Sequence, residues 1–423
     1  MTTIVIAAFG SRGDVAPYTG LGRRLADDGH RVVIAAQDAY RHMISANGFE
    51  FRSLPGDTES ATKASPFAQG FVDGARMRPS RQLLDEMLDD VRRLGHGLAD
   101  AANDADLLLL PAVAAVPGYH VAEGLGIRSA GVLLQPTAPT ADFPPSALSA
   151  RSFGRWGNLM VGKLGALAEK PYLALINELR LELGLSRTTL AGYQRRRAAT
   201  WPILHGFSEH VVPRPADWPA HLEVTGYWWP TEPDSWCPPA ELVDFLHAGP
   251  PPVFVGLGST ATARGPELSE IISTAVRAAG TRAVVQTGWA GLHCSGDDIL
   301  MVDDLPHSWL FRHVAAVVHH GGAGTTAATL RAGVPSIPVT GIMDQPFWAK
   351  RLRLLGTAPA ALPRATLTAA TLTAAIREVS ADPSYRARAQ HLSEQLAGED
   401  GAGVAAQRIT ELLDRSQEVH HGE

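Results

Sequence analysis

The sequence contains little cysteine, no long apolar run and no cluster of positive charge. Its two cysteines, Cys237 and Cys294, show neither a disulfide framework nor the spacing of a metal site. No apolar run approaches the roughly 20 residues of a membrane-spanning helix, so we expect no transmembrane segment. A net charge of −6 without a long basic run argues against nucleic acid as a partner. We therefore expect a cytoplasmic protein in a reducing compartment.

The composition is that of a globular protein with room for two domains. Hydrophobic residues make up 45% of the 423 residues, and charged residues make up 19%. A chain of this length exceeds the size at which a single hydrophobic core stops growing. Residues Met1–Ala8 are apolar but lack a basic start and a cleavage site. They therefore predict a first strand rather than a signal peptide.

Both halves of the chain open with the same pattern. Ile4–Ala8 predicts a strand that is buried on both faces. A helix is expected from near Pro17 to Asp28, and Arg31–Ala36 predicts the next strand. Such a βαβ unit belongs to a doubly wound α/β domain. Val253–Leu257 repeats the opening strand, and Gly-Ser follows soon after both, so two similar α/β domains are expected to face each other.

The segments between these units predict the domain boundaries. Residues 55–80 are expected to be loop, and 150–200 are expected to be mostly helical. A stretch rich in proline and tryptophan, 213–252, is expected to link the two domains. The first domain would then cover 1–212 and the second 253–400.

One stretch, residues 318–345, predicts a ligand site. An apolar strand over 314–318 leads into two histidines and a glycine-rich turn, and a helix begins near Ala323 or Thr325. A helix N-terminus at the carboxyl edge of a sheet suits a phosphate, because its free N–H groups point at the anion. Glycines let the anion approach the backbone, and hydroxyls or an imidazole add donors. The candidates are His319 or His320, with Gly321, Gly322, Gly324, Thr325 and Thr326.

The same stretch ends in residues that suit a polyol. A strand over 336–339 precedes Asp344 and Gln345, a carboxylate and an amide that can hold sugar hydroxyls. The sequence therefore predicts one site with a diphosphate at one end and a polyol at the other.

These residues also carry a family resemblance. The runs HHGGAGTT, RAGVP and DQPFWAKR resemble the donor-site signature of the family 1 nucleotide-sugar glycosyltransferases. The bacterial antibiotic glycosyltransferases and the sterol glucosyltransferases are the most similar branches. LPHSWLF at 305–311, GLGS at 256–259 and GSRGDVAP at 10–17 agree with them. The resemblance is strong from about 226 to 360, good in the first 40 residues and weak from 55 to 200.

The resemblance implies a fold and a reaction. It implies the GT-B fold, in which two Rossmann-like domains face each other across a cleft and a last helix, here within 401–423, crosses back to the first domain. It also implies inverting, metal-independent transfer from a UDP- or dTDP-sugar, with UDP-glucose expected first. The acceptor would be a hydroxyl of a lipophilic natural product or sterol-like alcohol. No cofactor is expected, since the nucleotide-sugar is a co-substrate.

The resemblance also assigns roles at the donor end. His319 would contact the diphosphate, Asp344 and Gln345 would hold the sugar, and Leu305 and His307 would hold the base. Uridine and thymidine both stay open, because the base-stacking tryptophan of the plant members is Asp304 here. Ser259 would either hydrogen-bond a phosphate or only stabilise the turn in which it lies. Trp289 would line the cleft or belong to the core.

His319 has alternatives of its own. It could cap its own loop, or pair with His320 at a metal, although no third ligand lies near in sequence.

Asp14 is the candidate general base. In members with a histidine base, that histidine falls at this position, and the glycopeptide and sterol branches have aspartate here. An aspartate beside a sugar site can take the proton of the acceptor hydroxyl. Alternatively, Asp14 caps the helix near Pro17. In the plant members an aspartate orients the histidine base. The corresponding region here, Leu110-Pro111-Ala112, has no carboxylate, so we do not expect a histidine–aspartate dyad in this chain.

The acceptor side is less defined. We expect residues 56–80 and 136–175 to shape the acceptor pocket, because loops at strand ends carry ligands in open α/β sheets. Its named candidates are Gln135, Pro136 and Phe143.

A different metal site and two rival functions are also compatible with parts of the sequence. Asp104 and Asp106 match the metal pair of a different glycosyltransferase fold, but they precede a strand rather than follow one. The rival functions are a nucleotide-sugar epimerase and a catalytically silent, donor-binding partner subunit.

Overall fold

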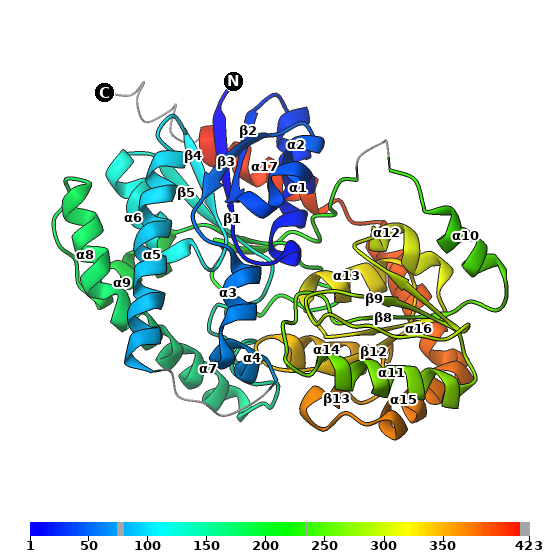
Figure 1. Cartoon of the computed structure of the whole chain (residues 1–423). Helices are drawn as coiled ribbons and strands as arrows, with labels where there is room; N and C mark the ends of the chain where they lie inside the picture. Colours follow the sequence, from blue (N-terminus) through cyan, green and yellow to red (C-terminus); the bar gives the residue numbers. More distant parts are fainter. Residues whose placement is uncertain (74–79, 233–235, 415–423) are drawn as a thin grey trace.

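The chain forms two parallel β-sheets, each covered by helices on both faces (Figure 1). The structure is a computed structural model that describes residues 1–73, 80–232 and 236–414. The first sheet has the order β3-β2-β1-β4-β5-β6-β7, and the second has the order β10-β9-β8-β11-β12-β13. Every strand pair is parallel. Each domain is therefore doubly wound, as the βαβ pattern predicted.

The first domain holds seven strands. They are β1 (Thr3–Ala8), β2 (Arg31–Gln37), β3 (Glu50–Leu54), β4 (Leu107–Leu110), β5 (Arg128–Leu133), β6 (Ile203–His205) and β7 (Leu222–Val224). Its described helices are α1 (Arg12–Asp27), η1 (Asp38–Tyr40), α2 (Arg41–Ala46), α3 (Thr58–Ala64), α4 (Pro66–Val72), α5 (Arg81–Ala101), α6 (Ala115–Leu125), α7 (Gly154–Gly165), η2 (Ala166–Tyr172), α8 (Leu173–Glu182) and α9 (Leu190–Thr200).

The second domain holds six strands. They are β8 (Val253–Gly256), β9 (Ala283–Gln286), β10 (Ile299–Val302), β11 (Ala316–His319), β12 (Ser336–Thr340) and β13 (Leu362–Pro363). The helices from the linker onward are α10 (Ala240–His247), α11 (Gly265–Ala279), α12 (His307–Leu310), η3 (Phe311–His313), α13 (Ala323–Arg331), α14 (Gln345–Leu354), η4 (Arg364–Thr366), α15 (Ala369–Ala381), α16 (Pro383–Ala397) and α17 (Gly401–Asp414).

The central strands are apolar throughout because helices cover both faces of each sheet. Ile4, Val5 and Ile6 of β1 are all fully buried, and they alternate between two clusters. The second sheet is divided in the same way, with Val255 on one face and Phe254 on the other. Among the described residues, no helix is both long and apolar enough to cross a bilayer.

Helix α1 begins earlier than the sequence predicted. It starts at Arg12 rather than near Pro17, which lies inside the helix. The reason is a capping arrangement: the backbone N–H and the hydroxyl of Ser11 both donate to the carboxylate of Asp14. Asp14 therefore lies in the first turn of a helix and not in a loop.

Two other expectations are corrected. The segment 55–80, expected to be loop, contains α3 and α4, with the Asp57 carboxylate accepting from the Ser60 N–H at 3.0 Å at the start of α3. Residues 74–79 lie outside the described part. The predicted linker 213–252 contributes β7 to the first sheet, so that sheet extends past residue 212.

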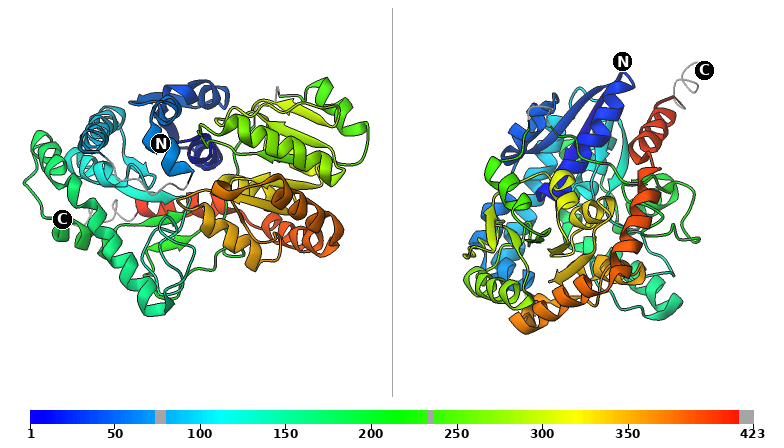
Figure 2. Two further views of the ribbon diagram at one scale, coloured as in Figure 1. Left: turned by 60° about the horizontal axis from the view of Figure 1, so that its bottom comes forward. Right: turned by 90° about the vertical axis from the view of Figure 1, so that its right-hand side faces the viewer.

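The end of the chain returns to the first domain. Ala405, Ala406 and Ile409 of α17 are fully buried in the same cluster as Ile4 and Leu21. Figures 1 and 2 show α17, in red, beside the blue N-terminal elements. Residues 415–423 of the segment expected to form this helix lie outside the described part.

Gly20 tests how closely α1 packs against the linker. A Cβ at this buried position would overlap the carbonyl oxygen of Trp229. A backbone atom cannot rotate away as a side chain can, so the overlap outweighs the ~1 kcal/mol that alanine gains over glycine in a helix. We expect Gly20→Ala to cost about 1–3 kcal/mol, visible as a lower Tm. Gly398→Ala is the matched control, because its nearest neighbour is 3.5 Å away; equal Tm values for both variants would contradict this packing.

Candidate functional site

The carboxyl edges of the two sheets face each other, and two helix N-termini meet there. Strand β1 leads into α1, and β11 leads into α13. A Cβ built on Gly324 in the first turn of α13 would lie 3.7 Å from the Cα of Gly13 in the first turn of α1. The predicted base and the predicted phosphate site thus lie on the two sides of one contact between the domains.

Asp14 is held on the first wall. Its carboxylate accepts from the Ser11 N–H at 2.9 Å and from the Ser11 hydroxyl at 2.8 Å. Burial raises its pKa, and hydrogen bonds from Ser11 and from the Gln135 side chain partly offset that rise. Gly10 makes room for this carboxylate: its φ is +128°, and a Cβ there would lie 2.7 Å from Asp14 Oδ2. The capping role and a position on the cleft therefore both hold for Asp14.

Asp344 lies on the second wall, at the start of α14. Its carboxylate accepts from Trp348 Nε1 at 2.8 Å. Burial raises the pKa of Asp344 to about 6, and the charge of Asp14 adds to the rise. The two predicted carboxylates are therefore close enough to influence each other. One end of the Gln345 amide already has a partner within the protein, because its side-chain oxygen accepts from the Gly341 N–H at 2.7 Å.

The two histidines differ in their surroundings. His319 is fully buried, and its Nδ1 accepts from the Gly321 N–H at 3.2 Å. Burial lowers its pKa to about 3, so at neutral pH the ring is neutral and Nε2 carries the proton. That buried Nε2 has no partner among the described residues. His320 is only partly buried, and its ring lies over Gly258 and Gly322.

The turn before α13 has the features of an anion cradle. Gly321 has φ +83°, and Gly322 is the N-cap of α13. The hydroxyl of Thr326 is buried and has no partner among the described residues, whereas Thr325 is half-buried. Free N–H groups, the helix dipole and an unpaired hydroxyl are all suited to a phosphate.

The predicted base-binding residues gather beside this turn. The Trp289 N–H donates to the Gly258 carbonyl at 3.1 Å, so the TGWAG and GLGS loops lie together. Trp289 and Ser259 are half-buried, so Trp289 is not a core residue. Leu305 is buried, and the ring of His307 stacks on Phe311 at 4.4 Å.

Of the acceptor candidates, Gln135 lies beside Asp14, the predicted general base, and its side chain hydrogen-bonds the Asp14 carboxylate. Pro136 is buried, and its carbonyl accepts from the Ser146 hydroxyl at 3.1 Å. Phe143 packs on Phe347 of α14 at 5.4 Å, within an apolar cluster shared by both domains. Phe143 thus helps join the domains, a role that a single sequence does not show.

Two ion pairs across the cleft were missed by sequence reasoning. Arg12 pairs with Asp304. Arg364 is fully buried, and its Nε donates to Asp73 of the first domain at 3.1 Å. The partners lie 292 and 291 residues apart, so no local pattern could reveal them. Thr262 also donates to Asp73, at 2.6 Å, which fixes the end of α4 against the second domain.

The aspartate pair weighed as a metal site lies at the opposite edge of the first sheet. Asp104 is bound by Arg31 and Arg52, and Asp106 accepts from the Thr3 N–H at 2.7 Å. No cluster of three or more metal-ligating side chains occurs in the described ranges. Both carboxylates thus have structural partners at the entry to their strands.

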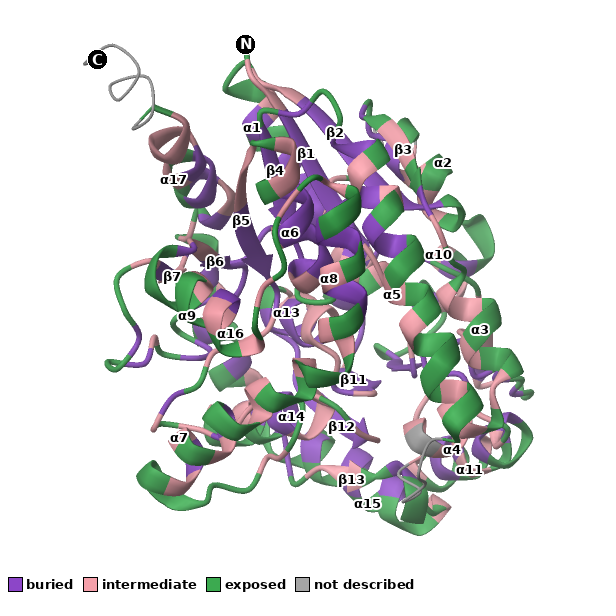
Figure 3. Cartoon of the chain, turned by 90° about the vertical axis from the view of Figure 1, so that its left-hand side faces the viewer, coloured by how far each residue is buried: buried purple, intermediate pink, exposed green. Residues whose placement is uncertain are grey.

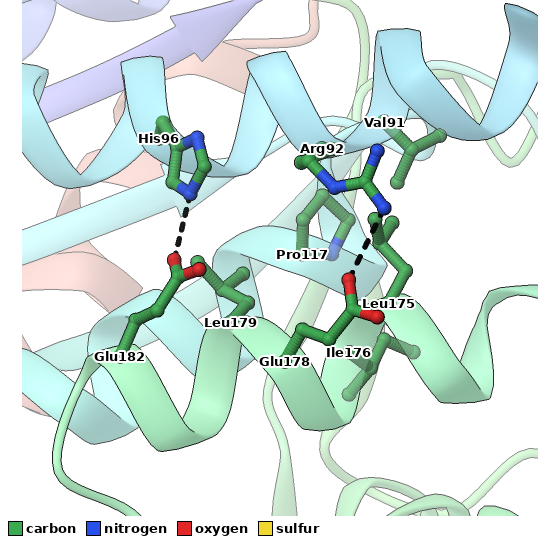
Figure 4. A pocket seen from close by; sticks show the side chains of 9 residues that line it. All are labelled: Val91, Arg92, His96, Pro117, Leu175, Ile176, Glu178, Leu179 and Glu182. Carbon is green, nitrogen blue, oxygen red and sulfur yellow. Dashed lines mark hydrogen bonds and ion pairs between the residues drawn. The ribbon is translucent and has the colours of Figure 1, made fainter.

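Two cavities lie away from the cleft. One of about 10 Å³ lies between α5 and α8, where Arg92–Glu178 and His96–Glu182 bridge the helices (Figure 4). It is about the size of one water molecule. A second of about 340 Å³ lies beside Arg128 and Trp201, at the amino end of β5. Neither contains a predicted site residue.

Comparison with known proteins places this geometry in a family. A model described as Glycosyltransferase family 28 N-terminal domain matches residues 4–125. A model described as Erythromycin biosynthesis protein CIII-like, C-terminal domain, matches residues 285–412. The chain is 35% identical to the O-mycaminosyltylonolide 6-deoxyallosyltransferase of Streptomyces fradiae, with 99% of each chain covered. It is 31% identical to the sterol 3-beta-glucosyltransferase UGT80A2 of Arabidopsis thaliana, covering 98% of this chain and 66% of that one.

Solved structures share the fold. The calicheamicin glycosyltransferase CalG4 has a TM-score of 0.69 at 18% identity, with 98% of this chain and 99% of that chain covered. The glycosyltransferase SsfS6 of Streptomyces sp. SF2575, complexed with thymidine diphosphate, has a TM-score of 0.62 at 21% identity, covering 97% and 100%. The family model and the relatives show that the chain is a glycosyltransferase, and its fold is of the GT-B type, as expected. The chain belongs to the family that contains the Streptomyces fradiae enzyme and the sterol 3-beta-glucosyltransferases.

The raised pKa of Asp344 predicts a pH-dependent cost in stability. Its folded pKa of about 6 exceeds the ordinary 3.8, so ionisation destabilises the native state as pH rises between these values. Asp344→Asn removes that cost, and we expect it to stabilise the protein above pH ~6 by on the order of 2 kcal/mol. Below pH ~4 the gain should vanish. Urea unfolding at both pH values measures it, with exposed Asp297→Asn as control; a gain independent of pH would contradict the prediction.

Proposed function

We propose that the protein is an inverting glycosyltransferase that needs no metal. Its donor would be a UDP- or dTDP-sugar, with UDP-glucose the first candidate, and its acceptor a hydroxyl of a lipophilic natural product or sterol-like alcohol. The observation that carries the proposal is the position of Asp14 opposite the N-terminus of α13. The relatives support the class of acceptor, since one is named for a tylonolide and the others for sterols.

This geometry supports the following reaction. Asp14 takes the proton of the acceptor hydroxyl, and its burial raises its pKa toward the working pH, which favours that transfer. The acceptor oxygen attacks the anomeric carbon on the side facing Asp14. The diphosphate leaves on the opposite side, toward α13, whose N-terminus carries roughly half a positive charge. Attack and departure on opposite faces give inversion, while Asp344 and Gln345 hold the sugar hydroxyls.

His319 can serve as a neutral donor to the diphosphate. Its Nδ1 is occupied, so the proton on Nε2 is free for a phosphate oxygen. Because that atom is buried, a neighbouring group must shift before a ligand reaches it. The glycines at 321 and 322 give the adjacent backbone that freedom.

A direct assay separates the candidate functions. The purified protein is incubated with several sugar nucleotides, with and without an acceptor library and excess EDTA, and the products are identified by mass spectrometry. A glycosyltransferase yields glycosylated acceptor in both the presence and the absence of chelator. Conversion of donor alone would indicate an epimerase, and binding without turnover a silent partner subunit. Loss of transfer with EDTA, restored by Mg²⁺ or Mn²⁺, would contradict the metal-free mechanism.

Asp14→Asn tests the base. Asparagine still accepts the hydrogen bonds of Ser11 but cannot take a proton. We expect kcat to fall by about 10²–10⁴-fold, with donor affinity and Tm not reduced. Asp38→Asn, an exposed substitution after the adjacent strand β2, should retain full activity. If Asp14 serves only to hold the first turn of α1, the asparagine variant should be near wild type in every assay, since its side-chain oxygen can still accept from Ser11.

Substitution of His319 and of His320 tests which histidine contacts the diphosphate of the donor. We expect His319→Ala to weaken binding of the nucleoside diphosphate and to lower kcat, and His320→Ala to do so less. Calorimetric titration with UDP and dTDP measures the first effect and steady-state kinetics the second. Since His319 is buried, each variant's Tm is recorded, and only variants folded at the assay temperature are compared. A larger effect at His320 would move the phosphate contact to that residue.

A further inference from the structure

Helix α7 carries an exposed apolar stripe. Trp156, Met160 and Leu164 follow one another at spacings of four residues on one face of α7, while Phe153 lies directly before the helix and Leu167 lies after it in η2. Trp156 is 81% exposed, and the other four are between 46% and 57% exposed. Of the fourteen large hydrophobic residues exposed in the described part of the chain, six lie within 148–167.

The helix is anchored by its opposite face. Asn158 and Gly162 are buried there. The Asn158 amide donates to the Ala141 carbonyl at 3.0 Å, and Gly162 packs on Pro139. A helix that packs on a domain normally turns its apolar face inward. Here a polar and a small residue face the domain and the apolar stripe faces outward, so the core does not explain the stripe. Figure 3 shows α7 at the edge of the molecule with largely exposed residues.

The surroundings of the stripe are positively charged. Residues 143–168 contain Arg151, Arg155 and Lys163 and no carboxylate, although the chain as a whole has a net charge of −6. All three side chains belong to exposed residues. Arg155 pairs with Asp142 at 2.9 Å. The result is an apolar stripe with basic flanks and an exposed tryptophan.

We propose that α7 is a docking helix for an anionic phospholipid surface. Its apolar stripe enters the boundary between headgroups and acyl chains, while Arg151 and Lys163 contact the phosphates. Amphipathic helices with basic flanks lie in this way in the plane of a bilayer, and tryptophan favours the interface. Positive charge near the surface strengthens binding to anionic lipid.

The charge distinguishes this occupant from a second copy of the chain. A symmetric dimer through the same face would bring the basic flanks of the two copies toward each other, and like charges oppose such a contact. An anionic lipid surface matches both the apolar stripe and its flanks.

Vesicle sedimentation tests the proposal without any substrate, so its outcome is independent of the proposed glycosyl transfer. The probe is sucrose-loaded vesicles of equal parts phosphatidylglycerol and phosphatidylcholine. We expect the wild-type protein to pellet with these vesicles, and less with phosphatidylcholine alone or in about 0.5 M salt. The double variant Trp156→Glu, Leu164→Glu should bind at least roughly tenfold more weakly, since two apolar side chains no longer enter the bilayer.

Two controls make the result specific. Leu181→Glu changes a leucine on α8 that is 50% exposed, against 57% for Leu164, and should pellet like wild type. Lys163→Glu should weaken binding to anionic vesicles but not to phosphatidylcholine alone. Unbound wild-type protein, or a double variant that pellets normally, would overturn the proposal. So would a wild-type dimer in sedimentation velocity that the double variant dissociates, because the occupant would then be a second copy.

Discussion

Two helix N-termini that meet between the domains impose the main electrostatic constraint on this molecule. Each carries roughly half a positive charge, so the gap between α1 and α13 favours negative groups. Asp14 and Asp344 are placed around this gap, and burial raises the pKa of both. An anionic ligand in the same gap would add negative charge and raise both pKa values further. Binding of an anion there would therefore favour proton uptake at Asp14 and Asp344.

Two kinds of contact join the domains around α1 and α13: an apolar cluster and a buried ion pair. An apolar cluster that includes Trp218 and Phe347 joins them on one side. The buried Arg364 joins them through Asp73, and each of these two groups compensates the charge of the other. Because a buried arginine without its carboxylate is costly, separating α4 from the second domain must expose both groups to water. The end of α4 is therefore held by the second domain, whereas the start of α3 bonds its own sheet through Thr58 and Gln37.

Much of this architecture could be predicted from local pattern, and what could not be predicted depends on distant partners. The strands were recognisable because parallel strands buried on both faces are continuous apolar runs, as in Ile4–Ala8. The turn at 319–325 was recognisable because histidines, glycines and a helix start follow one another directly. The predicted start of α1 near Pro17 is wrong because the helix is capped earlier, by Ser11 and Asp14, and Pro17 is tolerated inside it. The role of Phe143 and the pairing of Arg364 depend on contacts between domains, which spacing in a single sequence does not encode.

The return of α17 to the first domain has a consequence for how the chain acquires its structure. Ala405, Ala406 and Ile409 complete the cluster that contains Ile4 and Leu21, close to 400 residues earlier in the chain. During synthesis from the N-terminus, the first sheet therefore emerges with part of its apolar surface uncovered. It stays so until the second domain has been made. A ribosome-bound chain that stops before α17 is a candidate for chaperone binding, and the two domains mature together although each has its own sheet.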